Sequence, residues 1–455
     1  MTVTAVSPKS IPSLSQSSFQ QKLRLILEPT SYFEDLLGCG SDMVMMPSAG
    51  YEKPVVTVYN PEALKQILVN DQRLFSSPGI LNKLLAPLTG TRSLASLDGD
   101  RHKRERKLMM PSFHGERMYN YGNLIQGIIR DELLKLTVGQ VFIAQEMTQR
   151  ITLRTIIEVV FGIKKGDRYE PIIELTQGIL NRFSSPLATS FLFFDSLQKD
   201  FGPWSPWGSF IRARQKLDDL IYAEIGDRRA HPDPDRTDIL SLLINARDEA
   251  GEAMTDSELR DEMMLLLFAG HETTAIALAW SLYWMHADPS ILAKLRSELA
   301  DANSSNPMDI FRLPYVSAVG NETLRINPVA MFTFARQAEA DTELLGYKIV
   351  AKDILFGCIY ALHQRPDLYP NPRQFRPERF LERQYTPYEF MPFGGGTRRC
   401  LGEALAQFEL RLGIDAFATV ADFELLDDIP LAAKRKGVVL SPKTGVKMRL
   451  LGIKN

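Results

Sequence analysis

The chain has 455 residues, of which 45% are hydrophobic and 24% are charged, as is typical of a globular protein with a sizeable core. Its formal net charge of −2 provides no overall basic field, so we expect no nucleic-acid partner. The three cysteines, Cys39, Cys358 and Cys400, are too few for a disulfide framework and favour a reducing, cytoplasmic location.

The first 20 residues are rich in serine, proline and glutamine and contain no apolar run of the length that a signal peptide or a membrane span needs. We therefore expect a flexible tail over residues 1–20. No linker, internal repeat or low-complexity tract divides the remainder. The sequence predicts one large domain over residues 21–455, with no membrane span.

The first elements of this domain alternate between helix and strand. Apolar spacing predicts a helix over residues 21–37, and short β-rich runs predict strands over 43–46 and 55–59. A helix over 63–69 follows, because Asn60 and Pro61 suit its cap and first position. Residues 78–97 mix proline and glycine with leucines, which predicts a loop that lines a pocket.

A basic helical segment lies within residues 97–113. His102 and Arg106 are four residues apart and share one face of it. Taken alone, such a segment is typical of a solvated helix surface. Long helical patterns follow over 146–161, 169–183 and 210–228. The phenylalanine- and tryptophan-rich stretch 184–206 between the last two is either a core connection or a lid over an apolar pocket, which then contacts a membrane surface.

A capping box at Thr255-Asp256-Ser257-Glu258 predicts the start of a long helix over residues 256–285, apolar on most faces and therefore buried. The polar run Ala269-Gly270-His271-Glu272-Thr273-Thr274 interrupts its apolar pattern. A buried carboxylate is costly, so this run indicates function. The alternative is a polar kink filled with water.

The C-terminal third carries short motifs ahead of a glycine-rich loop. Glu322 and Arg325 form an E-x-x-R pattern that occurs by chance in most proteins, and Arg379 belongs to P-E-R-F. An extended run from residue 328 ends at Arg336, and residues 438–445 predict a hairpin.

Residues 393–402 deliver Cys400 from a run of three glycines directly into an apolar helix. A cysteine at the start of a helix faces unpaired amides, which favours the thiolate. Arg398 adds a cation suited to a carboxylate. Such a thiolate suits a haem iron as an axial ligand. The alternative is a buried structural cysteine.

The loop matches F-x-x-G-x-R-x-C-x-G at all five fixed positions: Phe393, Gly396, Arg398, Cys400 and Gly402. With the other motifs in the same order, the chain resembles the cytochrome P-450 family from about residue 40 onward, and in particular its soluble bacterial and cyanobacterial members. The resemblance implies a mainly α fold with small β-sheets. It also implies haem b with Cys400 as the iron ligand, and hydroxylation or epoxidation of a hydrophobic substrate with O2 and two electrons.

The resemblance assigns the other motifs to cofactor and oxygen chemistry. The haem-binding positions are His102, Arg106, Arg336, Phe393, Arg398 and Gly402, with the histidine replacing the tryptophan of many members. Thr273 hydrogen-bonds dioxygen, Glu272 relays protons, and the small Ala269 and Gly270 leave room beside them.

The resemblance also implies that Glu322, Arg325 and Arg379 form a buried ion-pair triad that locks the cysteine loop. Apolar residues in pocket-lining positions indicate a long-chain fatty acid or a terpenoid as substrate: Leu94, Leu267, Phe268, Ala269, Met331, Phe332 and Leu440. Tyr59 with Lys53 is a candidate anchor for a fatty-acid carboxylate.

The chain contains no flavin domain or iron–sulfur cysteine cluster, so we expect electrons from ferredoxin or flavodoxin with its reductase. Lys103, Arg104 and Lys107 are expected to face this donor near Arg399. We expect a monomer. Two alternatives remain: a peroxide-driven peroxygenase or isomerase, whose relatives lack the acid–threonine pair, and a non-catalytic haem sensor or carrier.

Overall fold

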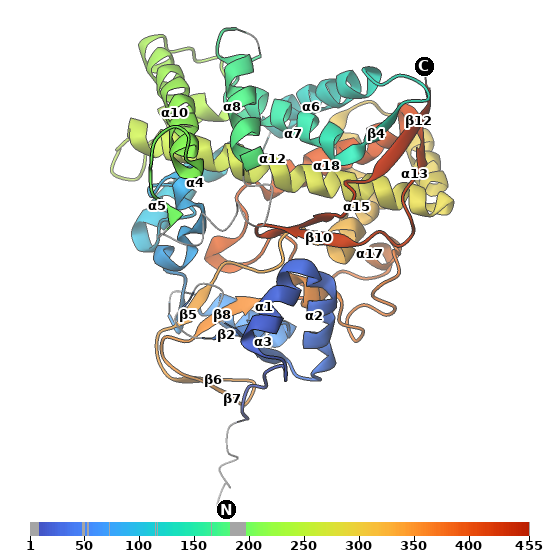
Figure 1. Cartoon of the computed structure of the whole chain (residues 1–455). Helices are drawn as coiled ribbons and strands as arrows, with labels where there is room; N and C mark the ends of the chain where they lie inside the picture. Colours follow the sequence, from blue (N-terminus) through green and yellow to red (C-terminus); the bar gives the residue numbers. More distant parts are fainter. Residues whose placement is uncertain are drawn as a thin grey trace, which may run out of the picture.

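The computed structural model describes residues 9–47, 51, 54–71, 73–113, 115, 117–164, 166–182 and 197–454. Figure 1 shows a large helical portion above a smaller portion that combines a sheet with the first helices. Each portion has its own hydrophobic core, and the larger core belongs to the helices. The mainly α fold with small sheets is therefore confirmed.

Helix α12 (Asp256–Ala287) crosses the middle of the helical portion (Figure 1) and packs against α7 (Ala144–Val160) and α18 (Glu403–Thr419). The other helices of this portion surround these three: α6 (Arg117–Leu134), α8 (Tyr169–Arg182), α10 (Pro206–Ala230), α11 (Ile239–Asn245), α13 (Pro289–Ala302), α14 (Pro307–Arg312) and α15 (Pro314–Ile326).

The main sheet has five strands in the order β1-β2-β8-β5-β3, with β2 and β8 parallel and the other pairs antiparallel. Its strands are β1 (Met43–Met46), β2 (Val55–Val58), β3 (Phe75–Ser76), β5 (Arg336–Ala338) and β8 (Ile354–Gly357). Helix α3 (Pro61–Val69) follows β2, and its buried residues contribute to the core of this portion.

Smaller sheets complete the fold. They are β4 (Val141–Ile143) with β12 (Lys447–Ile453) and β9 (Ala421–Leu425), β6 (Thr342–Leu344) with β7 (Tyr347–Ile349), and β10 (Ala433–Lys436) with β11 (Val439–Pro442). The hairpin predicted over residues 438–445 is thus present but begins earlier, at β10. Short helices connect these elements: η1 (Gly79–Leu85), α4 (Ala86–Thr89), α5 (Gly99–Met109), η2 (Met110–Phe113), α16 (Ile359–His363), α17 (Arg379–Glu382) and η4 (Gly396–Arg398).

The predicted capping box starts α12. Thr255 Oγ1 accepts from Glu258 N at 3.3 Å, and Glu258 Oε2 accepts from Thr255 N at 2.8 Å. The helix is long and apolar enough to cross a membrane by length and composition, but 78% of its most apolar window is buried inside the protein. These features describe the core helix of a folded domain.

The N-terminal expectations need two corrections. The helix predicted over residues 21–37 is divided into α1 (Ser18–Leu27) and α2 (Pro29–Gly38), because proline lacks the amide hydrogen that a continuous helix requires. The tail predicted over residues 1–20 extends too far. Lys9 N donates to Gly346 O at 2.8 Å and Met45 N donates to Pro12 O at 2.7 Å, so this segment pairs with strands of the domain.

Candidate active site

The loop that delivers Cys400 is shaped by main-chain hydrogen bonds and by glycine. Cys400 N donates to Phe393 O at 3.0 Å, and Gly394 N donates to Met391 O at 3.0 Å. Gly396 has a φ of +66°, and a Cβ there would lie 2.7 Å from Asp71 Oδ2. The glycine is therefore required both by the backbone conformation and by the close approach of a buried carboxylate.

Cys400 is exposed, yet burial raises the pKa of its thiol to about 11, so the thiol lies on an interior surface. The amide of Gly402 and the cations Arg106 and Arg399 act in the opposite direction. They do not outweigh burial, so the helix end by itself does not produce the thiolate that the sequence pattern favoured. A metal ion deprotonates a thiol that coordinates it, and this position suits that role.

Two expected propionate-binding residues, His102 and Arg106, lie on α5, and Arg106 is near the thiol. His102 is buried, and burial, followed by the nearby Arg398 and Arg106, lowers its pKa to about 4. Its imidazole is neutral at physiological pH. Burial also lowers the pKa of Arg106, while Cys400 opposes that shift, which places the guanidinium near the sulfur.

Arg398 donates to the carbonyl oxygens of Leu94 (3.0 Å), Ser77 (2.7 Å) and Leu97. Its side chain is buried, and within the described part of the chain neither it nor Arg106 forms a salt bridge with a carboxylate. Cations buried without a carboxylate are costly, so this donor set fits a cofactor that brings carboxylates of its own. A porphyrin with two propionates meets that requirement.

The fourth expected propionate ligand, Arg336, is already paired. Its Nε lies 3.2 Å from Asp71 Oδ1, and its guanidinium donates to Phe334 O at 3.0 Å and to Gly395 O at 3.1 Å. Asp71 was not identified from the sequence, because an isolated aspartate after a helix carries no pattern.

Thr273 and Ala269 are one turn apart on α12 and share a face of the helix. Thr273 Oγ1 donates to Ala269 O at 2.7 Å, and Ala269 is exposed although the helix around it is buried. Gly270 differs from the expectation that it leaves room for dioxygen. A Cβ on Gly270 would lie 2.6 Å from Ile156 Cδ1, so this glycine allows close packing of α12 on α7.

Glu272 is buried and accepts from Gln149 Nε2 at 2.8 Å, Gln145 Nε2 at 3.3 Å and Lys436 Nζ at 2.8 Å. Burial opposes its charged form, but Lys436 and Gln149 outweigh that effect and lower its pKa. The carboxylate is thus directed at α7 and β10. The sequence did not identify Lys436, which lies 164 residues away.

His271, next to it, lies 2.9 Å through Nδ1 from Thr152 Oγ1 on α7, and burial lowers its pKa to about 4. Part of the polar run in α12 is therefore a polar layer between two helices rather than a reaction surface.

The three residues of the expected ion-pair triad lie together and are at most 1% exposed. Arg325 donates to Glu322 through Nε at 2.7 Å and Nη2 at 2.8 Å, and Arg379 Nε donates to Glu322 Oε1 at 3.0 Å. Arg325 also donates to His363 O at 2.9 Å, while His363 Nε2 accepts from Met391 N at 3.0 Å. The triad is thus connected through His363 to Met391, two residues before the cysteine loop.

Comparison with known proteins decides the family. The sequence model of the family described as Cytochrome P450 matches residues 29–447. A Mycobacterium tuberculosis protein provisionally named cytochrome P450 135B1 is 33% identical over 397 residues, covering 87% of this chain and 82% of its own length. The chain belongs to the cytochrome P450 family.

Solved structures agree with this cytochrome P450 in fold. The retinoic acid-bound cyanobacterial CYP120A1 has a TM-score of 0.82 at 23% identity, covering 98% of this chain and 100% of that one. The cytochrome P450DA heme domain has a TM-score of 0.84 at 21% identity, with 99% and 98% coverage. Membership of the family makes the chain an oxidoreductase of the haem-thiolate monooxygenase type, with haem b on a cysteine thiolate as is characteristic of the family. Members use redox partners and hydrophobic substrates.

The residues expected to line the substrate pocket of this P450 are divided between its two cores. Leu94, Leu267 and Phe268 belong to the helical core, whereas Met331 and Leu440 belong to the core of the sheet portion. Strand β11 connects the two cores. It contacts α12 of the helical core, and its residue Leu440, which belongs to the other core, donates through its main-chain N to Val329 O at 2.9 Å.

Phe332 differs from that group. Its ring lies 5.5 Å from Phe33 and 5.8 Å from Phe356, so an aromatic cluster accounts for its position without a substrate. Tyr59, the proposed carboxylate anchor, is buried and donates to Leu36 O at 2.7 Å, which removes it from that role. Its expected partner Lys53 lies outside the described residues.

The basic face expected to meet an electron donor also needs a correction. Arg104 is half-buried and forms salt bridges with Glu105 at 2.6 Å and Asp248 at 2.5 Å. The side chains of Lys103 and Lys107 are 60% and 71% exposed. The two lysines are therefore more exposed than Arg104, although each also has an acidic neighbour: Lys103 pairs with Asp100 at 3.5 Å, and Lys107 pairs with Glu249.

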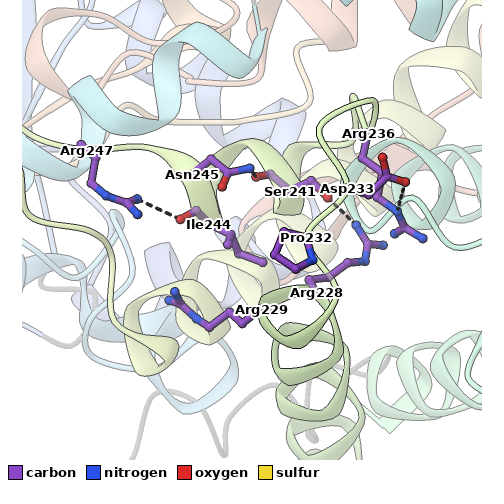
Figure 2. A pocket seen from close by; sticks show the side chains of 9 residues that line it. All are labelled: Arg228, Arg229, Pro232, Asp233, Arg236, Ser241, Ile244, Asn245 and Arg247. Atoms are coloured by element: carbon purple, nitrogen blue, oxygen red, sulfur yellow. Dashed lines mark hydrogen bonds and ion pairs between the residues drawn. The ribbon is translucent and has the colours of Figure 1, made fainter.

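A separate basic hollow of about 210 Å³ lies between the end of α10 and α11 (Figure 2). The arginine side chains that line this hollow already form hydrogen bonds and ion pairs with other groups of the protein. Arg228 donates to Asp238 at 2.9 Å, Arg229 donates to Asp256 at 2.8 Å, and Arg247 donates to two carbonyl oxygens. None of its lining residues belongs to the candidate active site.

Proposed function

We propose that Cys400 is the thiolate ligand of haem b and that His102, Arg106 and Arg398 hold the propionates. The observation that carries this proposal is that the buried Arg398 and the partly buried Arg106, which lies near the thiol, form no salt bridge with a carboxylate of the described residues. When bound, the haem supplies the activation of dioxygen that hydroxylates a C–H bond. Phe393 and Gly402 belong to the same loop, and its main-chain hydrogen bonds fix the sulfur.

Two residues of α12 have different proposed roles in proton transfer. Thr273 Oγ1 lies on the accessible face with Ala269 and is placed to hold a proton beside the reaction space. Glu272, held as a carboxylate by Lys436, relays protons from the side of β10. This acid–threonine arrangement favours a reductase-dependent monooxygenase over a peroxide-driven enzyme. A haem sensor or carrier would have no need of it.

For the substrate, we propose a long-chain fatty acid or a terpenoid. Apolar residues from both cores converge on β11 and α12, and Met331 offers an adaptable surface. The proposed electron donor is an acidic ferredoxin or flavodoxin that reaches Lys103 and Lys107. We place the protein in the cytoplasm as a monomer. Of the aromatic stretch 184–206, residues 184–196 lie outside the described part, but Phe201 and Trp204 are 64% and 81% exposed and support peripheral membrane contact.

The ligand assignment is tested through the three cysteines. We expect the reduced, CO-bound protein to show the red-shifted Soret band of thiolate haem. Cys400→Ala should abolish that band, whereas Cys39→Ala and Cys358→Ala should retain it. A shifted band in Cys400→Ala would refute the assignment.

The substrate class is tested separately, by titrating fatty acids and terpenes and recording the shift of the haem spectrum. Oxygen-dependent product formation with a surrogate reductase then distinguishes the enzyme from a sensor or carrier. Binding of all these ligands without any product would favour the carrier.

A further inference from the structure

A single carboxylate, Asp71, connects three segments at the base of the cysteine loop. It lies two residues after the end of α3, and its side chain is 3% exposed. Its Oδ2 accepts from Thr397 N at 2.9 Å, from Thr397 Oγ1 at 2.6 Å and from Arg336 Nη2 at 3.2 Å. A buried carboxylate with both a main-chain donor and a cation is strongly oriented.

Arg336 extends this connection to the strand portion. It stands at the start of β5 and donates to Gly395 O at 3.1 Å while paired with Asp71. The loop is therefore held on two sides: Asp71 binds the amide of residue 397, and Arg336 binds the carbonyl of residue 395. These atoms flank Gly396, the position at which a Cβ would collide with Asp71 Oδ2 and lie 3.1 Å from Arg336 Nη2.

The same carboxylate lies within the cluster of cations beside the thiol. Asp71 acts on His102 and Arg398 against the effect of burial, so its charge reaches both. A negative charge in a desolvated region interacts strongly with neighbouring charges. Its loss would change the electrostatic potential at the haem site as well as the geometry of the loop.

We propose that Asp71 is a positioning residue for the haem-thiolate site: it fixes the glycine loop through Thr397 and holds Arg336 against that loop. This inference rests on the proposed role of Cys400. The carboxylate itself touches neither the cysteine nor the substrate and acts through Thr397 and Arg336.

The first test is Asp71→Asn, which retains the shape of the side chain but removes its charge. We expect the holoprotein to form, the haem reduction potential to become more positive, and haem to transfer severalfold faster to an acceptor apoprotein. The matched control is Asp238→Asn. Asp238 also forms a buried pair with an arginine, Arg228, and caps α11 through Ser241 N, but it lies outside the candidate active site. Asp238→Asn should lower the free energy of unfolding without changing the haem reduction potential.

The second test retains Asp71 and changes its partner. Thr397→Val removes the hydroxyl donor and should accelerate haem loss and increase the fraction of reduced CO-bound protein that lacks the red-shifted band. Thr397→Ser keeps the hydroxyl and should restore parental behaviour. This pair remains informative if Asp71→Asn does not retain haem.

An unchanged potential and unchanged haem-loss rate in Asp71→Asn, or a serine variant as defective as the valine variant, would overturn the proposal. An equal shift of potential in Asp238→Asn would also overturn it. These outcomes differ from failure of the ligand assignment, which appears only as a thiolate band retained in Cys400→Ala.

Discussion

Thr273 combines a structural hydrogen bond within α12 with the chemical role that we propose for it. Its hydroxyl donates back to the carbonyl of Ala269, a bond that slightly weakens a helix interior. The sequence identified this residue because a polar run breaks an apolar pattern, yet only part of that run faces the reaction space. His271 and Glu272 bind α7 and β10 instead.

Thr273→Ala should retain haem and substrate binding but divert reducing equivalents to hydrogen peroxide, because the proton held at Oγ1 is lost. Thr273→Ser should restore the parental value. The measurement is product formed per reduced cofactor consumed, with peroxide quantified in parallel. An unchanged ratio in the alanine variant would remove Thr273 from the proposed mechanism.

At the scale of elements, the buried ion pairs of Glu322 connect the helices to the segment that precedes the cysteine loop. Glu322→Gln should leave Arg325 and Arg379 without their common carboxylate, at a cost of about 3–5 kcal/mol. We expect largely haem-free or insoluble protein. The matched control is Glu378→Gln in the same P-E-R-F segment, which pairs with the half-exposed Lys294 and should cost at most about 1 kcal/mol. Holoprotein yield and urea unfolding give the comparison, and equal stability of the two variants would contradict the triad.

Helix α18 carries a buried carboxyl group, that of Glu409. Burial raises its pKa to about 8, with Thr155 on α7 acting in the other direction. Between pH 4.5 and 8 the folded state retains a proton that the unfolded chain releases. This group therefore makes stability fall as pH rises through that window, by up to about 1.4 kcal/mol per pH unit.

Glu409→Gln should flatten this slope and raise the urea midpoint at pH 8 above that of the parent. Glu146→Gln, an exposed glutamate on α7, is the control and should leave the slope unchanged. A parental slope in Glu409→Gln would show that the carboxyl is already ionised in the folded protein.

For the whole molecule, we expect the distribution of surface charge to determine where the proposed acidic donor docks, since the net charge of −2 gives no overall attraction to it. The exposed Lys103 and Lys107 lie on the helix that carries His102 and Arg106. A local basic patch accelerates association with an acidic protein, and salt screens this effect.

Lys103→Glu with Lys107→Glu should slow reduction by ferredoxin severalfold at low ionic strength, with little change in haem content. The control reverses two other lysines, Lys348 and Lys352, at the sheet end of the molecule. Stopped-flow reduction at low and high salt provides the measurement. Equal rates for both double variants at low salt would place the docking site elsewhere.

A local pattern in the sequence was sufficient for the start of α12, because the residues of its capping box are adjacent in the chain. The ion-pair triad and the mainly α architecture were instead implied by the resemblance to the family, which rests on the fixed spacing of the cysteine loop and on the order of the other motifs. Apolar spacing predicted one helix where the structure has two, because Pro29 lacks the amide hydrogen needed to continue α1 and instead starts α2.

Only the tertiary structure decided the partners of several charged side chains that no motif had paired. Asp71 meets Thr397 across 326 residues, Glu272 meets Lys436 across 164, and Arg104 meets Asp248 across 144. Gly270 likewise serves a contact with Ile156 that helical spacing does not reveal. Sequence spacing determines which face of a helix a residue occupies, whereas folding determines what lies opposite that face. The partners of buried polar groups therefore depend on long-range packing.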